Sequence, residues 1–132
     1  MSLGLVGLNN SKVIPLLPSA ARAVAQAYVS ANQEARPGSS RLIVVIDATA
    51  VTATPSVVPK IQGYDPFADK YFDLLVGAAI ATVSTVVLMI GPGITVAANL
   101  AAAVPLPPIW RVILTHGDTD AITYTVTALE CE

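Results

Sequence analysis

Charged side chains are scarce in this 132-residue sequence. Asp, Glu, Lys and Arg make up 12% of the residues and apolar residues 54%, whereas a globular domain usually has about 25% charged residues. A small domain needs surface charge to stay dispersed in water. The shortage therefore predicts that partners or lipid cover much of the outside of this protein.

Cysteine and histidine are nearly absent, with one of each. Cys131 alone excludes an internal disulfide and a cysteine-based zinc site. No HExxH, CxxC, GxGxxG or Ser–His–Asp pattern accompanies His116, so we expect no catalytic residue, metal or cofactor. The seven basic residues are scattered and the net charge is −2, which excludes the basic patch that nucleic-acid binding requires. The N-terminus lacks the basic region of a signal peptide.

No charge interrupts residues 74–110, and this run permits two interpretations. One is a membrane hairpin, because residues 74–90 reach the lower limit for a spanning helix. The other is the interior of a β-protein. Gly91, Pro105 and Pro107 break the run, and no Lys/Arg asymmetry would orient a hairpin in a bilayer. These features favour a sheet and no membrane.

Patterns of β-branched residues and period-2 alternation predict strands through most of the chain. Strands are expected over residues 41–52, 54–66, 70–78, 82–93, 110–117 and 121–130. Pro59 indicates an edge position or a bulge in the second of these. Residues 20–30 are rich in alanine and permit a helix or a strand. Short strands separated by turns predict an all-β fold, an antiparallel β-sandwich of jelly-roll type, over residues 19–132.

Residues 1–18 are expected to form an extended apolar arm, because glycines, prolines and asparagines interrupt a series of apolar side chains. The arm would lie on its own domain or on a neighbouring subunit. The uncharged loop 94–108 is too long and too apolar to be left in water. The residues predicted to contact a partner are Leu3, Leu5, Val6, Leu8, Val13, Ile14, Leu16, Leu17, Ile94, Leu100 and Leu106.

Two acidic clusters could in principle carry chemistry. His116, Asp118 and Asp120 could form a divalent-ion loop or an acid–base pair, but the sequence offers no further ligands, so a polar hairpin turn is favoured. Asp65 and Asp69 have the spacing of a turn.

The aromatic residues are few and fall into two groups. Trp110 is expected in the core because an aromatic side chain buries a large area. The group Tyr64, Phe67, Tyr71 and Phe72 surrounds one predicted hairpin. A contact surface and a core position are equally open for this group.

The stretches "LIVVIDATAVTATPSVVPKIQGYDPFADKYFDLLVGAAI" and "STVVLMIGPGITVAANLAAAVPLPPIWRVILTHGDTDAITYTV" resemble small structural proteins of tailed bacteriophages. The resemblance covers residues 19–126 and consists of strands and turns rather than catalytic groups. It implies a non-enzymatic virion protein, for which we expect a homo-oligomer that decorates the capsid surface by binding the major capsid protein lattice. A neck or tail component is the alternative. A small membrane protein or a carbohydrate-binding module is less favoured.

Overall fold

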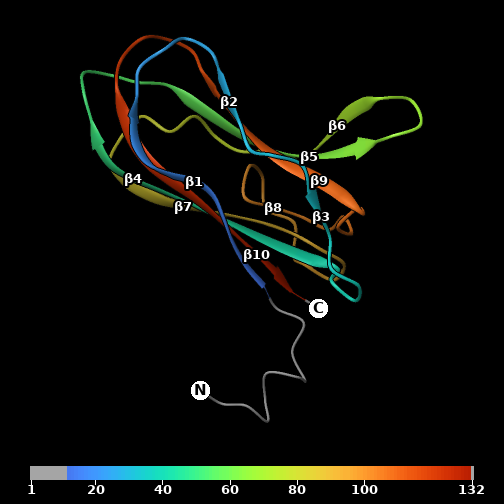
Figure 1. Cartoon of the computed structure of the whole chain (residues 1–132). Helices are drawn as coiled ribbons and strands as arrows, with labels where there is room; N and C mark the ends of the chain where they lie inside the picture. The colour runs from blue at the N-terminus through green and yellow to red at the C-terminus, as the bar shows by residue number, and fades with distance from the viewer. Residues whose placement is uncertain (1–11, 132) are drawn as a thin grey trace, which may run out of the picture.

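Two β-sheets packed face to face form the protein, as Figure 1 shows. The computed structural model describes residues 12–131, and no helix occurs among them. Sheet A has the strand order β1 (Lys12–Arg22), β10 (Ile122–Cys131), β4 (Arg41–Val51), β7 (Ser84–Ile90) and β8 (Ala101–Ala102). Sheet B has the order β2 (Ala27–Val29), β9 (Ile109–His116), β5 (Val57–Asp65) and β6 (Lys70–Val76), and β3 (Gln33–Glu34) also pairs with β9.

The strand connections are those of a jelly roll. The chain passes from β1 in sheet A to β2 in sheet B and from β4 in sheet A to β5 in sheet B, and it ends by crossing from β9 to β10. All pairings are antiparallel except the short β7–β8 contact. With β1 beside β10 and β2 beside β9, this is the two-sheet Greek-key arrangement of that fold. The predicted β-sandwich is therefore confirmed.

The core lies between the sheets, where the alternate residues of each strand meet. On β4 and β10 every second side chain is buried, as the period-2 pattern predicts. Trp110 is fully buried and its indole N–H donates to Glu130 Oε2 at 3.0 Å, so its predicted core position is confirmed. Glu130 Oε1 accepts the backbone N–H of Arg36 at 3.1 Å. These bonds partner both oxygens of a carboxylate that has no exposed surface.

The segment predicted as an arm divides at the start of β1. Residues 12–18 belong to this edge strand and pair with β10. Ile14 is part of the core, and Leu16 and Leu17 pack against it. Residues 1–11, which include the predicted contact residues Leu3, Leu5, Val6 and Leu8, lie outside the described residues.

The predicted edge position for Pro59 is wrong, because β5 lies between β9 and β6. The Pro59 carbonyl accepts the N–H of Gly77, at 2.8 Å, just beyond the end of β6. In an antiparallel strand the N and O of one residue point to the same side. The nitrogen of Pro59 therefore points towards the end of β6. Its lack of a hydrogen costs no hydrogen bond between β5 and β9. The bulge lies two residues further on, between Ile61 and Gln62.

The long uncharged run forms sheet and loops. Residues 84–90 are β7, and residues 101–102 are β8. Within residues 12–131 no helix is long and apolar enough to span a membrane. The ambiguous residues 20–30 are likewise not helical: they contain the end of β1, a bend and β2.

Candidate interaction surfaces

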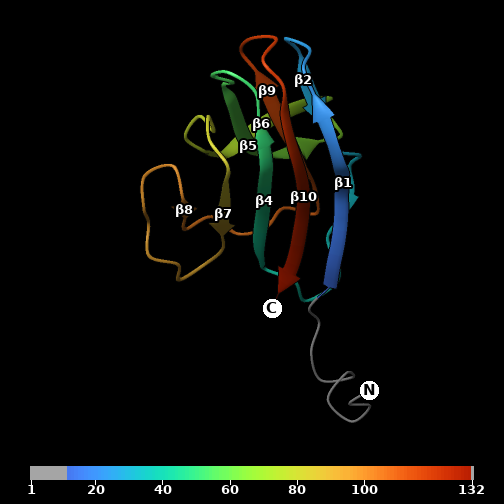
Figure 2. The same ribbon diagram turned by 90° about the vertical axis from the view of Figure 1, so that its left-hand side faces the viewer.

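The side of sheet A that faces away from sheet B carries three rows of side chains running across its strands. Figure 2 looks onto this side, with β1, β10, β4 and β7 next to one another. We call these three rows the sheet A outer face. From the pairing register, the rows are Val13–Leu129–Ile43–Met89, Pro15–Thr127–Val45–Val87 and Thr125–Asp47–Thr85.

The first two rows of the sheet A outer face are mostly apolar, whereas the third consists of Thr125, Asp47 and Thr85. The exposed Arg41 lies on the same side of β4, two residues before Ile43. Val13 is 65% exposed, Val87 41% and Met89 36%. Asp47 is the one ionisable residue in the three rows, and its Oδ1 accepts a hydrogen bond from the Thr85 hydroxyl at 3.1 Å. Exposed apolar side chains that adjoin one another are uncommon on monomeric proteins, which makes this face a candidate for contact with a partner.

The outer side of sheet B carries a chain of polar contacts. Lys60 Nζ lies 3.5 Å from Asp73 Oδ2, and the Gln62 amide donates to Asp73 Oδ1 at 2.8 Å. Arg111 Nε in turn donates to Gln62 Oε1 at 2.9 Å. The Arg111 guanidinium lies 3.4 Å from the centre of the Tyr71 ring, a cation–π contact. This side of the molecule is suited to water.

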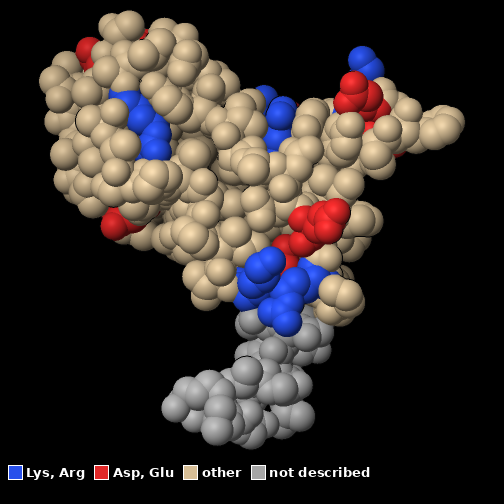
Figure 3. All heavy atoms as spheres, in the orientation of Figure 1, with Lys and Arg blue, Asp and Glu red and all other residues tan. Residues whose placement is uncertain are grey.

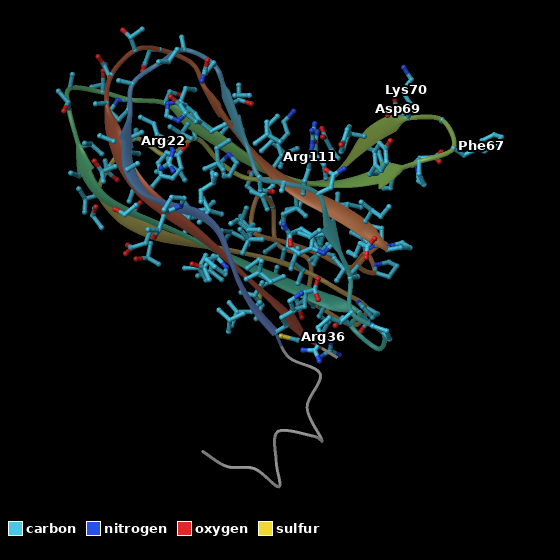
Figure 4. The ribbon with its side chains drawn as sticks, in the orientation of Figure 1. Arg22, Arg36, Phe67, Asp69, Lys70 and Arg111 are labelled. Carbon is cyan, nitrogen blue, oxygen red and sulfur yellow. The ribbon has the colours of Figure 1, made fainter. Side chains whose placement is uncertain are left out.

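The β5–β6 hairpin projects from the body of the molecule, with Phe67 at its tip (Figures 1 and 4). Phe67 is completely exposed. The tip is held from within, because Asp65 Oδ1 accepts the N–H groups of Phe67 at 3.0 Å and Ala68 at 3.3 Å. The Tyr64 hydroxyl donates to Asp69 Oδ1 at 2.7 Å, and this bond raises the pKa of Tyr64. The predicted turn role of Asp65 and Asp69 is confirmed.

An open pocket of about 370 Å³ lies beneath the hairpin. Gly63 allows the Phe72 ring to lie directly against the backbone of β5, because a Cβ at this position would be 2.4 Å from that ring. The lining is mostly apolar and consists of Tyr64, Asp65, Pro66, Phe72, Pro107, Pro108 and Ile109. The hairpin thus presents an aromatic tip and an apolar pocket close together.

In the view of Figure 3 charged atoms lie at this hairpin, at the lower end of the molecule, and in smaller groups on the left and in the upper middle. Wide uncharged areas separate these groups in that view.

The residues predicted from the sequence to contact a partner do not form one surface. Ile14 and Leu106 belong to the core, and Ile94 is half-buried. Val13 is exposed on β1, whereas Leu100, 50% exposed, precedes β8 at the opposite edge of sheet A. The sequence-based prediction did not include the outward residues of β4, β7 and β10, which the structure brings together on one side of sheet A. The signal for them was the segment "RLIVVI", which is apolar at both parities, as in a strand covered on both sides.

A buried polar cluster occupies the end of the sandwich where β9 turns into β10. His116 is 4% exposed, and its Nε2 lies 2.9 Å from the Tyr124 hydroxyl. Arg22 stacks on the Tyr124 ring at 4.4 Å and donates to the carbonyl groups of Pro18, Ala20 and Tyr124. Burial, followed by the Arg22 charge, lowers the pKa of His116. Burial also raises the pKa of Tyr124 to about 12.

The two acidic residues next to this cluster, Asp118 and Asp120, accept hydrogen bonds from backbone N–H groups of the loops. Asp118 Oδ1 accepts the N–H of Asp120 at 3.1 Å, and Asp120 Oδ2 accepts the N–H of Thr54 at 3.2 Å. Within residues 12–131 no group of three or more His, Cys, Asp or Glu side chains could hold a metal ion. Asp118 and Asp120 therefore lie in a polar loop, but the predicted hairpin is wrong, because the loop joins β9 of sheet B to β10 of sheet A and His116 is buried at the end of β9.

No protein-family model matches the chain, no curated protein matches it, and no solved structure matches it. The resemblance to phage structural proteins therefore depends on the sequence patterns given above. Function has to be argued from the fold and its surfaces.

Proposed function

We propose that this protein is a structural component of a tailed-phage particle that decorates the capsid by binding the lattice of the major capsid protein. The sequence resemblance supports membership of the particle. The jelly roll adds a fold-level analogy, since this fold recurs in viral capsid proteins as well as in lectins. Among the described residues, Asp65, Asp118 and Asp120 accept hydrogen bonds from backbone N–H groups of turns and loops, which gives these acids a structural role.

The observation that carries the proposal is Phe67. An aromatic side chain that fills a pocket of the partner commonly supplies much of the energy of a protein interface. Phe67 has no contact that hides it from water, yet hydrogen bonds to Asp65 fix the turn that presents it. Because the turn is already ordered, little conformational entropy is lost when Phe67 is buried. Repetition over a symmetric shell then strengthens a modest contact through multivalency.

Reconstitution on particles stripped of this protein tests the role of Phe67. Phe67→Ala should reduce retention on the particle by about 30-fold or more, the usual effect of losing a central aromatic contact. Val83→Ala is the matched control, because Val83 is also an exposed apolar residue, at 60%. Retention would be measured by quantitative mass spectrometry of purified particles, with circular dichroism as the check on folding.

Two results would contradict the proposal. Equal retention of Phe67→Ala and the wild type would exclude the hairpin tip as the contact. Localisation by electron microscopy at the portal vertex or along the tail would instead identify a neck or tail component.

A further inference from the structure

We propose that residues 23–29 form a flap beside His116 that opens when the imidazole of His116 takes up a proton. The flap joins the end of β1 in sheet A to sheet B and includes β2 (Figure 1). This inference does not depend on the capsid role and concerns neither the hairpin nor an outer side of the sandwich. It follows from the contacts that hold the flap and from the surroundings of the imidazole.

The flap has few apolar contacts with the rest of the domain. None of residues 23–29 belongs to the hydrophobic core or packs against it. Val24 is 53% exposed and Val29 40%. The strand β2 has three residues and pairs with β9. A segment with so few buried apolar side chains has a low local stability and can open while the core stays folded.

Contacts with His116 and Arg22 hold the flap closed. The Gln26 carbonyl accepts the backbone N–H of His116 at 3.0 Å. The Tyr28 ring lies 4.9 Å from the His116 ring, measured between centroids. The Arg22 guanidinium lies 5.6 Å from the centre of the same Tyr28 ring. A change in the charge of the imidazole therefore acts directly on the groups that fasten the flap.

The hydrogen bonds of the His116 side chain suit a neutral imidazole. Nε2 lies 2.9 Å from the Tyr124 hydroxyl, whereas the buried Nδ1 has no hydrogen-bond partner among the described residues. A neutral imidazole has one N–H, but an imidazolium has two and must donate from both nitrogens. Protonation in the closed flap would therefore leave a buried N–H without an acceptor, which is costly in free energy.

The charges around His116 also oppose a second positive charge. The titratable or charged groups that face it are Arg22 on β1, Tyr28 on β2, Tyr124 on β10 and Asp118 after β9. On β5 the residue opposite is the uncharged Val57. Arg22 is 6% exposed and donates to three backbone carbonyl groups. Burial and the Arg22 charge lower the pKa of His116, and they outweigh Asp118, which raises it.

Opening of the flap removes both difficulties at once. The imidazolium and the Arg22 guanidinium would reach water, which supplies an acceptor for Nδ1–H and screens the two charges from each other. The core need not open, because residues 23–29 contribute nothing to it. Opening would also uncover the part of the β9 edge that β2 covers, so that acid would make this edge available to a further strand.

Hydrogen exchange of the full-length chain between pH 7.5 and pH 5.5 tests the flap. The reporters are the N–H of His116 and the N–H of Ser30, which donates to the Val112 carbonyl at 2.9 Å. Their protection factors, corrected for intrinsic exchange, should fall by up to about tenfold from pH 6.5 to pH 5.5, because opening takes up one proton. In urea too dilute to unfold the domain they should stay nearly constant, since local opening exposes little surface.

The N–H of Val44 is the matched control, because Val44 is a core residue of the central strand β4. It should be protected more strongly than the reporters, and its protection should fall with urea. The variant His116→Gln keeps a polar side chain that takes up no proton, so the protection of Ser30 should no longer depend on pH. In the wild type, NMR titration of the imidazole should be accompanied by shifts of the flap signals.

Three results would overturn the proposal. One is an imidazole that titrates while the flap signals and their protection stay unchanged. Another is a Ser30 N–H with the same protection and the same dependence on urea as Val44, because His116 would then be protonated only on global unfolding. The third is a His116→Gln protein in which the protection of Ser30 still falls with pH, since another group would then be its source.

Discussion

The two outer sides of the sandwich share one core but differ in chemistry. Sheet A presents valine, isoleucine, methionine and threonine with one carboxylate, whereas sheet B presents a chain of polar contacts from Lys60 to Arg111. Behind both sides lies the same core of buried residues. The two sides therefore differ in chemistry although they share one core, so the fold itself does not require the difference.

The largest effect should come from the shared interior and should be independent of either outer side. Trp110→Ala removes the largest buried side chain and also the N–H that Glu130 accepts. The free energy of unfolding should fall by about 3–5 kcal/mol, because a cavity forms and a buried carboxylate loses a donor. Urea denaturation followed by circular dichroism measures this. A loss below about 1 kcal/mol would mean that the core is not organised around Trp110.

A smaller effect should separate the two outer sides. Arg111→Met keeps an aliphatic stem but removes the charge over the Tyr71 ring and the hydrogen bond to Gln62. The free energy of unfolding should fall by about 1 kcal/mol. On the outer side of sheet A, Thr127→Val should change it by less than about 0.5 kcal/mol. Equal effects of the two changes would remove the distinction between the sides.

Dependence on pH near neutrality should come from the buried cluster and from neither outer side. The pKa of His116 is lowered in the folded protein, first by burial and then by Arg22. The unfolded chain therefore binds a proton more readily, so stability is complete above the unfolded pKa of about 6.5 and declines as the pH falls below it. His116→Gln should lose most of this decline. The measurement is the urea midpoint between pH 7.5 and pH 5.5, and an unchanged dependence in the variant would exclude His116 as its source.

The smallest effect is expected for the Lys60–Asp73 ion pair, whose side chains are 32% and 44% exposed. A double-mutant cycle with Lys60→Met and Asp73→Asn should give a coupling of no more than about 0.5 kcal/mol. Added salt should weaken that coupling. A coupling above about 1 kcal/mol that persists in salt would show a contact shielded from water, against the description of sheet B as the solvated side.

The sequence was sufficient to predict the central strands. In β4 and β10 the alternation of buried and outward side chains is local, so it is visible in the order of residues. Residues 12–18 of β1 were predicted as part of an arm because glycines, asparagines and prolines, among them Pro15 and Pro18, interrupt the apolar series there. An edge strand tolerates such residues, since its free side forms no ladder. Whether a segment lies at an edge depends on residues more than a hundred positions away, here β10.

The interaction surfaces were only partly visible in the sequence. In the first half of β4 the residues of both alternating sets are apolar. The pattern alone therefore does not distinguish the side that faces the core from the outer side. The turn at Asp65 was predictable from local residue types, whereas the full exposure of Phe67 depends on how far the hairpin projects from the body. Both gaps have the same cause: the position of a strand within the sandwich is set by distant parts of the chain.

The pairing of Lys12 with Glu130 brings the two ends of the described chain to one pole of the domain. The hairpin that carries Phe67 lies at a distance from that pole (Figure 1). A peptide or enzyme joined directly to Lys12 or to Cys131 would consequently leave the domain from this one pole, away from the aromatic tip. Attachment at the pole and presentation of Phe67 would then be separated along the length of the domain.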